Sequence, residues 1–126
     1  YCWGGNASGQ LGDATTTTRR APTRVGTESN WSVVQAGDDF SCGVRGGSTY
    51  CWGLNTSGQV GSGALVSAVT SPSLLEGGNT WSSLAAGSSH ACGLREGALL
   101  CWGLNSSSQL GRGAETFYSP VLIDIP

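Results

Sequence analysis

The chain carries three copies of one sequence, most clearly seen as Cys51-Trp52-Gly53-Leu54-Asn55-Thr56-Ser57-Gly58-Gln59-Val60-Gly61. The same pattern occupies residues 2–12 (CWGGNASGQLG) and 101–111 (CWGLNSSSQLG), at spacings of 49 and 50 residues. A fixed period of this length is the signature of a repeat architecture. The fold is therefore expected to consist of one unit that packs against copies of itself.

The remainder of the unit also recurs. Trp31, Ala36-Gly37 and Cys42 return 50 residues later as Trp81, Ala86-Gly87 and Cys92. A proline follows each copy of the first pattern, at positions 22, 72 and 120. We expect a single domain made of a partial repeat at 1–26 and full repeats at 27–76 and 77–126.

Period-2 alternation and turn residues predict short antiparallel strands within each unit. The expected strands are 32–35, 41–45 and 49–52, with a fourth at 23–25 after the proline. Four short strands in about 50 residues is the size of a β-propeller blade. Because Gly, Asn or Pro interrupts each unit every 8–12 residues, helical repeats are excluded. We predict an all-β propeller of four-stranded blades, with two and a half repeats present.

Composition narrows the classes of partner. The formal net charge is −2, and the six basic residues form no cluster beyond Arg19-Arg20, so nucleic acid is not an expected partner. The longest apolar runs fall well short of a membrane span. Five Trp residues distinguish the chain from disordered sequences, which are poor in aromatic residues.

The unit resembles the repeat of the regulator of chromosome condensation family. That repeat joins a Gly-x-x-His-Ser/Thr-x-x-Leu strand, a glycine turn, a Tyr-x-Trp-Gly strand and an Asn-x-x-Gly-Gln-Leu-Gly loop. The corresponding residues here are 87–94 (GSSHACGL), 96–97, 50–53 (YCWG) and 55–61 (NTSGQVG). The resemblance covers nearly the whole chain and implies a fragment of a seven-bladed propeller of roughly 350 residues.

Some positions depart from that pattern. Phe40 stands where His90 stands, Ser108 replaces the loop glycine, and Val60 replaces leucine. Such variation within one chain indicates that these positions serve packing and turns. We expect the recurring Trp3, Trp52 and Trp102 to pack between blades, and Gln10, Gln59 and Gln109 to hydrogen-bond loop backbone groups together with the recurring asparagines.

The cysteines give a specific prediction. If the hairpin centres on Gly46-Gly47, residues whose numbers add to 93 face each other, and Cys42 is directly opposite Cys51. This is a non-hydrogen-bonded pair with Cα atoms about 4.5 Å apart, within the disulfide range. The same geometry recurs with Glu96-Gly97 as the turn, which sets Cys92 opposite Cys101. We predict two disulfide bonds.

Two other interpretations of the cysteines are less favoured. They could be reduced and serve as small apolar residues, or bind zinc, although they lack the short spacing of structural zinc sites. Cys2 matches the second member of a pair, and its partner would lie nine residues upstream of Tyr1, so truncation explains the odd count. Disulfides favour an extracellular or cell-surface location.

Four asparagines head an Asn-x-Ser/Thr sequence, the acceptor for N-glycosylation in a eukaryotic secretory pathway. Attachment of a sugar at one or more of them is a further possibility. The four are Asn6, Asn30, Asn55 and Asn105.

The sequence does not favour catalysis. Phe40 replaces the single histidine, His90, in the neighbouring unit, and Ser88-Ser89 replaces Asp38-Asp39. We therefore expect no catalytic residues, cofactor, metal or small-molecule substrate, and interpret the chain as a secreted or cell-surface module for protein binding or extracellular structural assembly. The alternatives are a guanine-nucleotide exchange factor for a Ran-type GTPase, implied by the resemblance, and a secreted enzyme or enzyme inhibitor.

Two and a half blades leave unpaired edges and exposed faces. We therefore expect that these 126 residues form no closed monomeric propeller. The terminal faces near Trp3 and Trp102 would be covered by other parts of a longer chain, by a larger assembly or by further copies.

Overall fold

The computed structural model describes residues 1–77 and 80–125, in which ten β-strands and no helix occur. The strands form two four-stranded antiparallel sheets, ordered β3-β4-β5-β6 and β10-β9-β8-β7, and a two-stranded sheet, β1-β2. Their bounds are β1 Cys2–Gly4, β2 Arg19–Thr23, β3 Trp31–Ala36, β4 Phe40–Arg45, β5 Ser48–Leu54, β6 Ala68–Leu74, β7 Trp81–Ala86, β8 His90–Arg95, β9 Ala98–Gly103 and β10 Phe117–Leu122.

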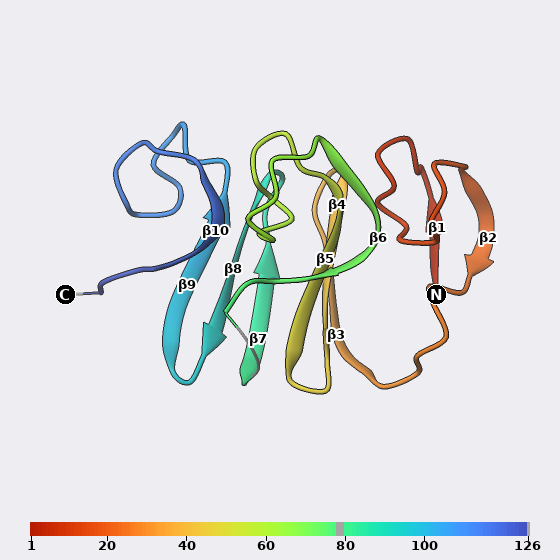
Figure 1. Cartoon of the computed structure of the whole chain (residues 1–126), viewed down its shortest axis with the longest axis horizontal. Helices are drawn as coiled ribbons and strands as arrows, with labels where there is room; N and C mark the ends of the chain where they lie inside the picture. The colour runs from red at the N-terminus through yellow and green to blue at the C-terminus, as the bar shows by residue number, and fades with distance from the viewer. Residues whose placement is uncertain (78–79, 126) are drawn as a thin grey trace.

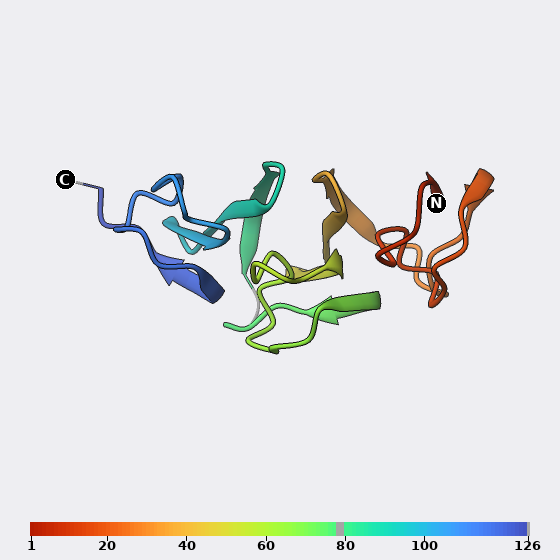
Figure 2. The same cartoon turned by 90° about the horizontal axis from the view of Figure 1, so that it is seen from above.

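The three sheets stand side by side along the long axis of the molecule (Figure 1). Seen from above, they are rotated relative to one another like blades (Figure 2). The first strand of the third sheet, β7, contacts β3 and β4 of the second sheet, so adjacent blades pack face to face. This arrangement confirms the expected all-β fold of propeller blades, with one half-blade (β1-β2) and two full blades.

The hairpin register agrees with the sequence arithmetic. Cys42 is opposite Cys51, with Gly43 opposite Tyr50 and Arg45 opposite Ser48. In the third blade, Cys92 is opposite Cys101. Tight turns at Gly46-Gly47 and Glu96-Gly97, all four residues at positive φ, fix this register because two-residue hairpins favour such residues.

The expected position of the fourth strand was wrong. The sequence predicts it at 23–25, after Pro22, but β2 spans Arg19–Thr23 and contains the proline. The corresponding β6 and β10 contain Pro72 and Pro120. These strands lie at the sheet edges, where a residue without an N–H is tolerated because one side of the strand pairs with nothing.

The main core lies between the second and third blades. Trp52 and Trp102 are 2% and 0% exposed, and each meets a second Trp of its own blade edge to face, at ring separations of 5.7 and 5.8 Å. Edge-to-face contacts add to the free energy gained from burying such large rings. The buried residues of this cluster are Phe40, Cys42, Val44, Cys51, Val60, Leu75, Trp81, Leu84, Ala91, Leu100 and Trp102.

Thr49, on β5, is fully buried, and among the described residues its Oγ1 is the one buried side-chain polar atom without a hydrogen-bond partner. We predict that Thr49→Val, which keeps the side-chain shape, raises the free energy of unfolding by about 1 kcal/mol, because an unsatisfied buried hydroxyl is costly. Urea unfolding followed by tryptophan fluorescence measures the change. The exposed Thr27→Val is the control and is expected to change little; a loss of stability specific to Thr49→Val would contradict the prediction.

Candidate functional site

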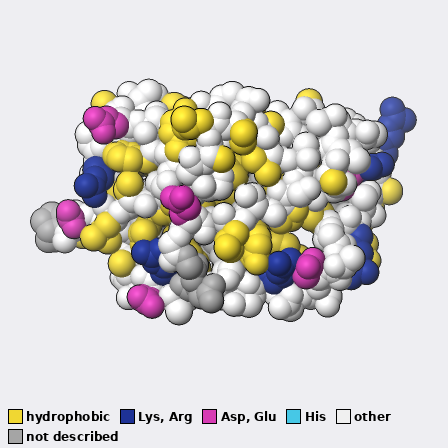
Figure 3. Space-filling model, viewed as in Figure 1, with side chains coloured by type: hydrophobic (Ala, Val, Ile, Leu, Met, Phe, Trp, Pro, Cys, Tyr) yellow, Lys and Arg dark blue, Asp and Glu magenta, His cyan; other side chains and the backbone are white. Residues whose placement is uncertain are grey.

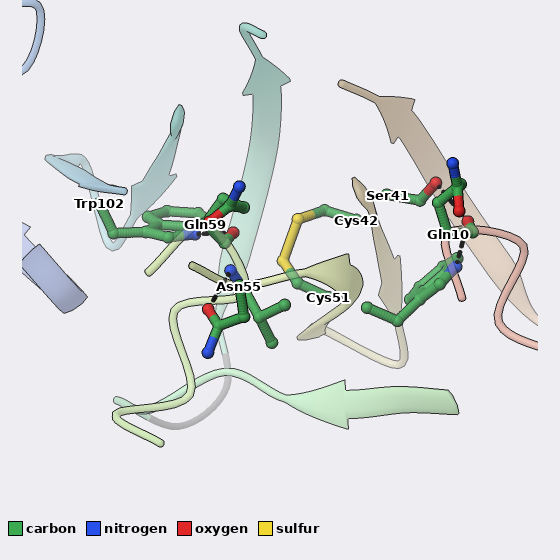
Figure 4. The surroundings of a disulfide bond; sticks show 9 residues. Gln10, Ser41, Cys42, Cys51, Asn55, Gln59 and Trp102 are labelled. Carbon is green, nitrogen blue, oxygen red and sulfur yellow. Dashed lines mark hydrogen bonds between the residues drawn. A yellow bond between two sulfur atoms is a disulfide. The ribbon is translucent and has the colours of Figure 1, made fainter. Parts of the chain in front are cut away.

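A hydrogen bond from an indole to a loop carbonyl joins each blade to the preceding repeat. The Nε1–H of Trp52 donates to the backbone oxygen of Gln10 at 2.9 Å, and the Nε1–H of Trp102 donates to that of Gln59 at 3.0 Å. Figure 4 shows Trp102 beside Gln59, and Ser41 directed at Gln10. Trp52 and Trp102 therefore lie between repeats, as the sequence predicts.

The tryptophans fit because a glycine lies beneath each of them. A Cβ on Gly12 would come within 2.7 Å of Trp52 Nε1, and a Cβ on Gly61 would come within 2.6 Å of Trp102 Cδ1. Both glycines also have positive φ. The Gln-x-Gly segment of the loop thus receives the tryptophan of the next blade. We call this segment the indole seat; its three copies are Gln10–Gly12, Gln59–Gly61 and Gln109–Gly111.

The recurring asparagines hold these loops in shape. Asn6, Asn55 and Asn105 are at most 1% exposed. Each Oδ1 accepts a hydrogen bond from the backbone N–H of the apolar residue five positions on, at 2.9 to 3.0 Å. The glutamines act similarly, because their Oε1 atoms accept backbone N–H groups of Ser8, Ser57 and Ser107. This confirms the predicted role of both residue types.

The same asparagines also determine what the following segment presents to solvent. Asn55 Nδ2 donates to the carbonyls of Ala64 and Val66, both at 2.9 Å. Leu65 lies between these two fixed carbonyls and is 82% exposed. In the first repeat, Asn6 Nδ2 likewise donates to the carbonyls of Thr15 and Thr17, with exposed Thr16 between them.

We call the segments 13–18, 62–67 and 112–116 display loops. They lie on the same edge of the three sheets, the upper edge in Figure 1. Sequence analysis did not identify them as a candidate site. The sequence does contain a signal for them: the segment between the loop glycine and the following proline has a different length in each repeat. These segments are Gly12 to Pro22, Gly61 to Pro72 and Gly111 to Pro120.

Three of the four asparagines that head an Asn-x-Ser/Thr sequence are buried in the folded chain. The side-chain nitrogens of Asn6, Asn55 and Asn105 donate to backbone carbonyls, and these residues are buried. A sugar on Nδ2 would remove those hydrogen bonds and would have no space. Asn30 is exposed in the segment before β3, so it alone of the four retains an accessible acceptor nitrogen.

Both predicted disulfides are present. Cys42–Cys51 and Cys92–Cys101 are bonded, each with a Cα separation of 4.1 Å, and Figure 4 shows the first of them between β4 and β5. Cys2 is a free cysteine. Burial raises the pKa of its thiol above the usual value, which keeps it protonated and poorly nucleophilic at neutral pH.

Asp13 anchors the first display loop. Its side chain is 5% exposed, and its Oδ2 accepts a hydrogen bond from the Nε–H of Arg19, with 2.6 Å between the nitrogen and the oxygen. Thr15 and Asn6 donate to its Oδ1. Burial alone would raise the pKa of this carboxyl, but the hydrogen bonds from Thr15, Arg19 and Asn6 lower it to about 2.

His90 and Asp39, the titratable residues considered above as candidates for catalysis, both make contacts within the fold. His90 packs on Gly87 as Phe40 packs on Gly37, and Asp39 accepts a hydrogen bond from Gln10 Nε2 at 3.0 Å. Within residues 1–77 and 80–125, no group of three or more His, Cys, Asp and Glu side chains could hold a metal ion. The same residues contain no helix long and apolar enough to cross a membrane.

The exposed ends of the array differ from expectation at one residue. Trp3 is 61% exposed, as expected for a terminal face. Trp102, which we expected on a terminal face, instead lies in the junction between the second and third blades. Beside the half-blade, a cavity of about 400 Å³ opens between Cys2, Trp31, Val34 and Trp52.

Comparison with known proteins agrees with this geometry. The profile described as "Regulator of chromosome condensation (RCC1) repeat" matches residues 1–44 and 46–94. The chain belongs to this family. A second profile with the same description matches residues 81–109, so RCC1 repeats extend through all three sheets. No curated protein sequence matches the chain.

Solved structures show the same fold at low sequence identity. Yeast RCC1 (Prp20), in a complex with Kap60, superposes with a TM-score of 0.87 at 23% identity over 98% of this chain and 32% of its own. Prp20p of Saccharomyces cerevisiae, studied for its binding to Gsp1p and histones, gives 0.85 at 23% identity, over 98% and 33%. Human WBSCR16 gives 0.80 at 24% identity, over 97% and 32%. The RCC1-repeat chain described here thus spans about a third of these relatives.

We predict that Cys42→Ala/Cys51→Ala lowers the free energy of unfolding by about 2–3 kcal/mol, because the bond closes a short loop in the unfolded chain. Chemical denaturation under non-reducing conditions measures the loss. Cys2→Ala, which removes a free thiol, is the control and is expected to change stability little. Equal stability of the double variant and the wild type would contradict the prediction.

A second prediction concerns pH. Because the pKa of Asp13 is lowered in the folded chain to about 2, its contribution to stability is complete above about pH 4 and is lost as the pH falls toward 2. Asp13→Asn is therefore expected to be less stable than the wild type at pH 6, with a difference that shrinks between pH 4 and 2. Unfolding curves at several pH values test this; a constant difference would show that the carboxylate charge is not responsible.

Proposed function

We propose that this chain is part of a secreted or cell-surface RCC1-repeat propeller that binds other proteins through its display loops and catalyses no reaction. The observation that carries the proposal is the pair of disulfides at equivalent positions of two successive blades, Cys42–Cys51 and Cys92–Cys101. Disulfides of this structural kind persist in oxidising compartments and are rare in the reducing cytosol.

The position of the disulfides supports a structural role for them. Each joins the two middle strands of its blade, and the sulfurs of the second blade belong to residues that are fully buried. Burial shields these sulfurs from the thiolates that reduce or exchange disulfides, unlike the exposed cysteines of redox sensors.

The display loops support protein binding. The asparagine of each repeat fixes the loop backbone, whereas the side chains of the display loops differ from repeat to repeat. The second loop holds Leu65 and Val66, 82% and 49% exposed. Apolar side chains held outward on an ordered backbone lose little entropy on binding, which favours an apolar patch on a partner protein.

An exchange factor for a Ran-type GTPase is the second candidate, because the yeast relative is reported with Gsp1p and histones. The buried disulfides and the net charge of −2 favour the first proposal over a nuclear protein that contacts chromatin. No contact among the described residues favours the alternative of a secreted enzyme.

The test is the oxidation state and location of the protein in its own cells. Surface and medium fractions are expected to contain it, with Cys42, Cys51, Cys92 and Cys101 protected from alkylation in peptide mass spectrometry and only Cys2 modified. Recovery from the cytosol with all five thiols alkylated would overturn the proposal. Acceleration of nucleotide release from a purified Ran-type GTPase would favour the second candidate.

A further inference from the structure

The second display loop, residues 62–67, presents an apolar side chain on a fixed backbone. Leu65 is 82% exposed and Val66 beside it is 49% exposed. Figure 3 shows hydrophobic side chains near the upper edge of the molecule, where the display loops lie. A leucine held outward in this way is available to fill a pocket on another protein.

The loop belongs to the middle repeat and has neighbours within the chain on both sides. The N–H of Gly63 donates to the backbone oxygen of Tyr118 in the third blade at 2.8 Å. On the other side, the N–H of Ala14, in the first display loop, donates to Thr70, near the start of β6, at 2.9 Å. The exposure of Leu65 is therefore a property of its own loop, whose two neighbours are in place.

One buried residue holds the peptide on both sides of Leu65. Asn55, which is 1% exposed, donates from Nδ2 to the carbonyls of Ala64 and Val66, both at 2.9 Å. Its backbone N–H donates to the carbonyl of Ser67 at 2.8 Å. We call these three hydrogen bonds the carbonyl clamp.

The clamped segment has a backbone that a protease can bind. Ala64, Leu65 and Val66 lie in no helix or turn, and none of them has positive φ. A serine protease places the side chain before the scissile bond in a specificity pocket, which is a hydrophobic slot in chymotrypsin and contains a carboxylate in trypsin. Leucine matches the hydrophobic slot.

We propose that the second display loop inhibits a serine protease with an apolar specificity pocket. Leu65 occupies that pocket, and the Leu65–Val66 bond lies at the catalytic serine. This deepens the proposed function, on which it rests, by naming the class of protein that this loop binds. Because the carbonyl clamp fixes the backbone before the two proteins meet, little conformational entropy is lost on binding.

The clamp also accounts for inhibition in place of digestion. The serine oxygen bonds to the carbonyl carbon of Leu65, the bond from this carbon to the nitrogen of Val66 breaks, and the serine proton passes through the histidine to that nitrogen. In a flexible substrate the new amine leaves and water hydrolyses the ester. Here Asn55 holds carbonyls on both sides of the cut, so the amine stays beside the ester carbon, re-forms the peptide bond and releases the serine.

The other two display loops each lack one of these features. Asn6 holds the carbonyls on both sides of Thr16, but threonine is polar and branched at Cβ, which restricts its side chain. Asn105 donates to the carbonyls of Arg112 and Gly113, which are consecutive, so no residue stands between them. Of the three loops, the second combines the clamp with an exposed, unbranched Cβ and an apolar side chain.

The experiment measures inhibition of purified chymotrypsin and trypsin by the intact protein, with a small chromogenic peptide as substrate. Competitive inhibition of chymotrypsin is expected, and none of trypsin. Leu65→Ala is expected to weaken inhibition at least about 30-fold, as for a residue at the centre of an interface. Leu74→Ala is the matched control, because Leu74 is also an exposed leucine, 51% exposed on β6, and should inhibit like the parent.

Leu65→Lys tests the position of the side chain directly. It is expected to transfer inhibition from chymotrypsin to trypsin, because the ammonium group pairs with the carboxylate of the trypsin pocket. Residue 65 is exposed, so this change leaves the fold intact. A Leu65→Lys variant that inhibits chymotrypsin as the parent does would contradict the proposal.

Asn55→Ala tests the carbonyl clamp. Chymotrypsin is expected to cut this variant rapidly between Leu65 and Val66, which denaturing electrophoresis detects because neither disulfide joins the two fragments. Asn105→Ala is the matched control, because it removes an equally buried asparagine and leaves the clamp intact. The two Leu65 variants decide the proposal even where loss of Asn55 unfolds the chain.

An intact protein that leaves chymotrypsin fully active at about 100 μM, a weak limit for an interface of standard size, would overturn the proposal. Digestion at Leu65–Val66 at the rate of a flexible peptide would do the same. Because purified proteases are used, these results do not depend on where the protein resides. The proposed function is decided separately, by location and thiol alkylation.

Discussion

The hydrogen bond from a tryptophan indole to the glutamine carbonyl of the preceding repeat is the interaction on which this structure depends. A blade has an apolar face that it cannot bury alone. The indole fills the gap between two blades, and its single N–H must find an acceptor when it is buried. The carbonyl of Gln10 or Gln59 supplies that acceptor. This one contact therefore constrains both the spacing and the relative orientation of adjacent blades.

This contact constrains the rest of the repeat. The seat needs glycine at Gly12 and Gly61, because any side chain there would occupy the space of the indole. The loop that presents the carbonyl must be rigid, and the buried asparagine provides rigidity by accepting one backbone N–H and donating to two carbonyls. The recurring Asn-x-x-x-Gln-x-Gly pattern is therefore a single device for joining blades.

Rigidity at the junction also creates the surface available for function. The asparagine that supports the indole seat also holds the backbone of the display loop through its side-chain nitrogen. One residue therefore stabilises both the junction between blades and the exposed loop. The two disulfides brace the middle of each blade away from these loops. Exposed loop side chains such as Leu65 and Val66 can therefore vary without disturbing the junction. An array of nearly identical units can acquire distinct binding surfaces in this way.

The sequence by itself determined the repeat, the blade and both disulfides, because these depend on local features: a fixed period, period-2 alternation and a two-residue turn that sets the register of one hairpin. Only the tertiary structure decided which recurring residues are buried. Asn6, Asn30, Asn55 and Asn105 share an acceptor motif, but three of them close loops against the core and one faces solvent. Trp3 and Trp52 share the sequence Tyr-Cys-Trp-Gly, but Trp3 is 61% exposed whereas Trp52 is 2% exposed and packs on the loop of the preceding repeat. The edge position of β2, β6 and β10, which admits proline within a strand, likewise depends on sheet order. Burial arises from contacts between units, and a pattern within one unit does not specify them.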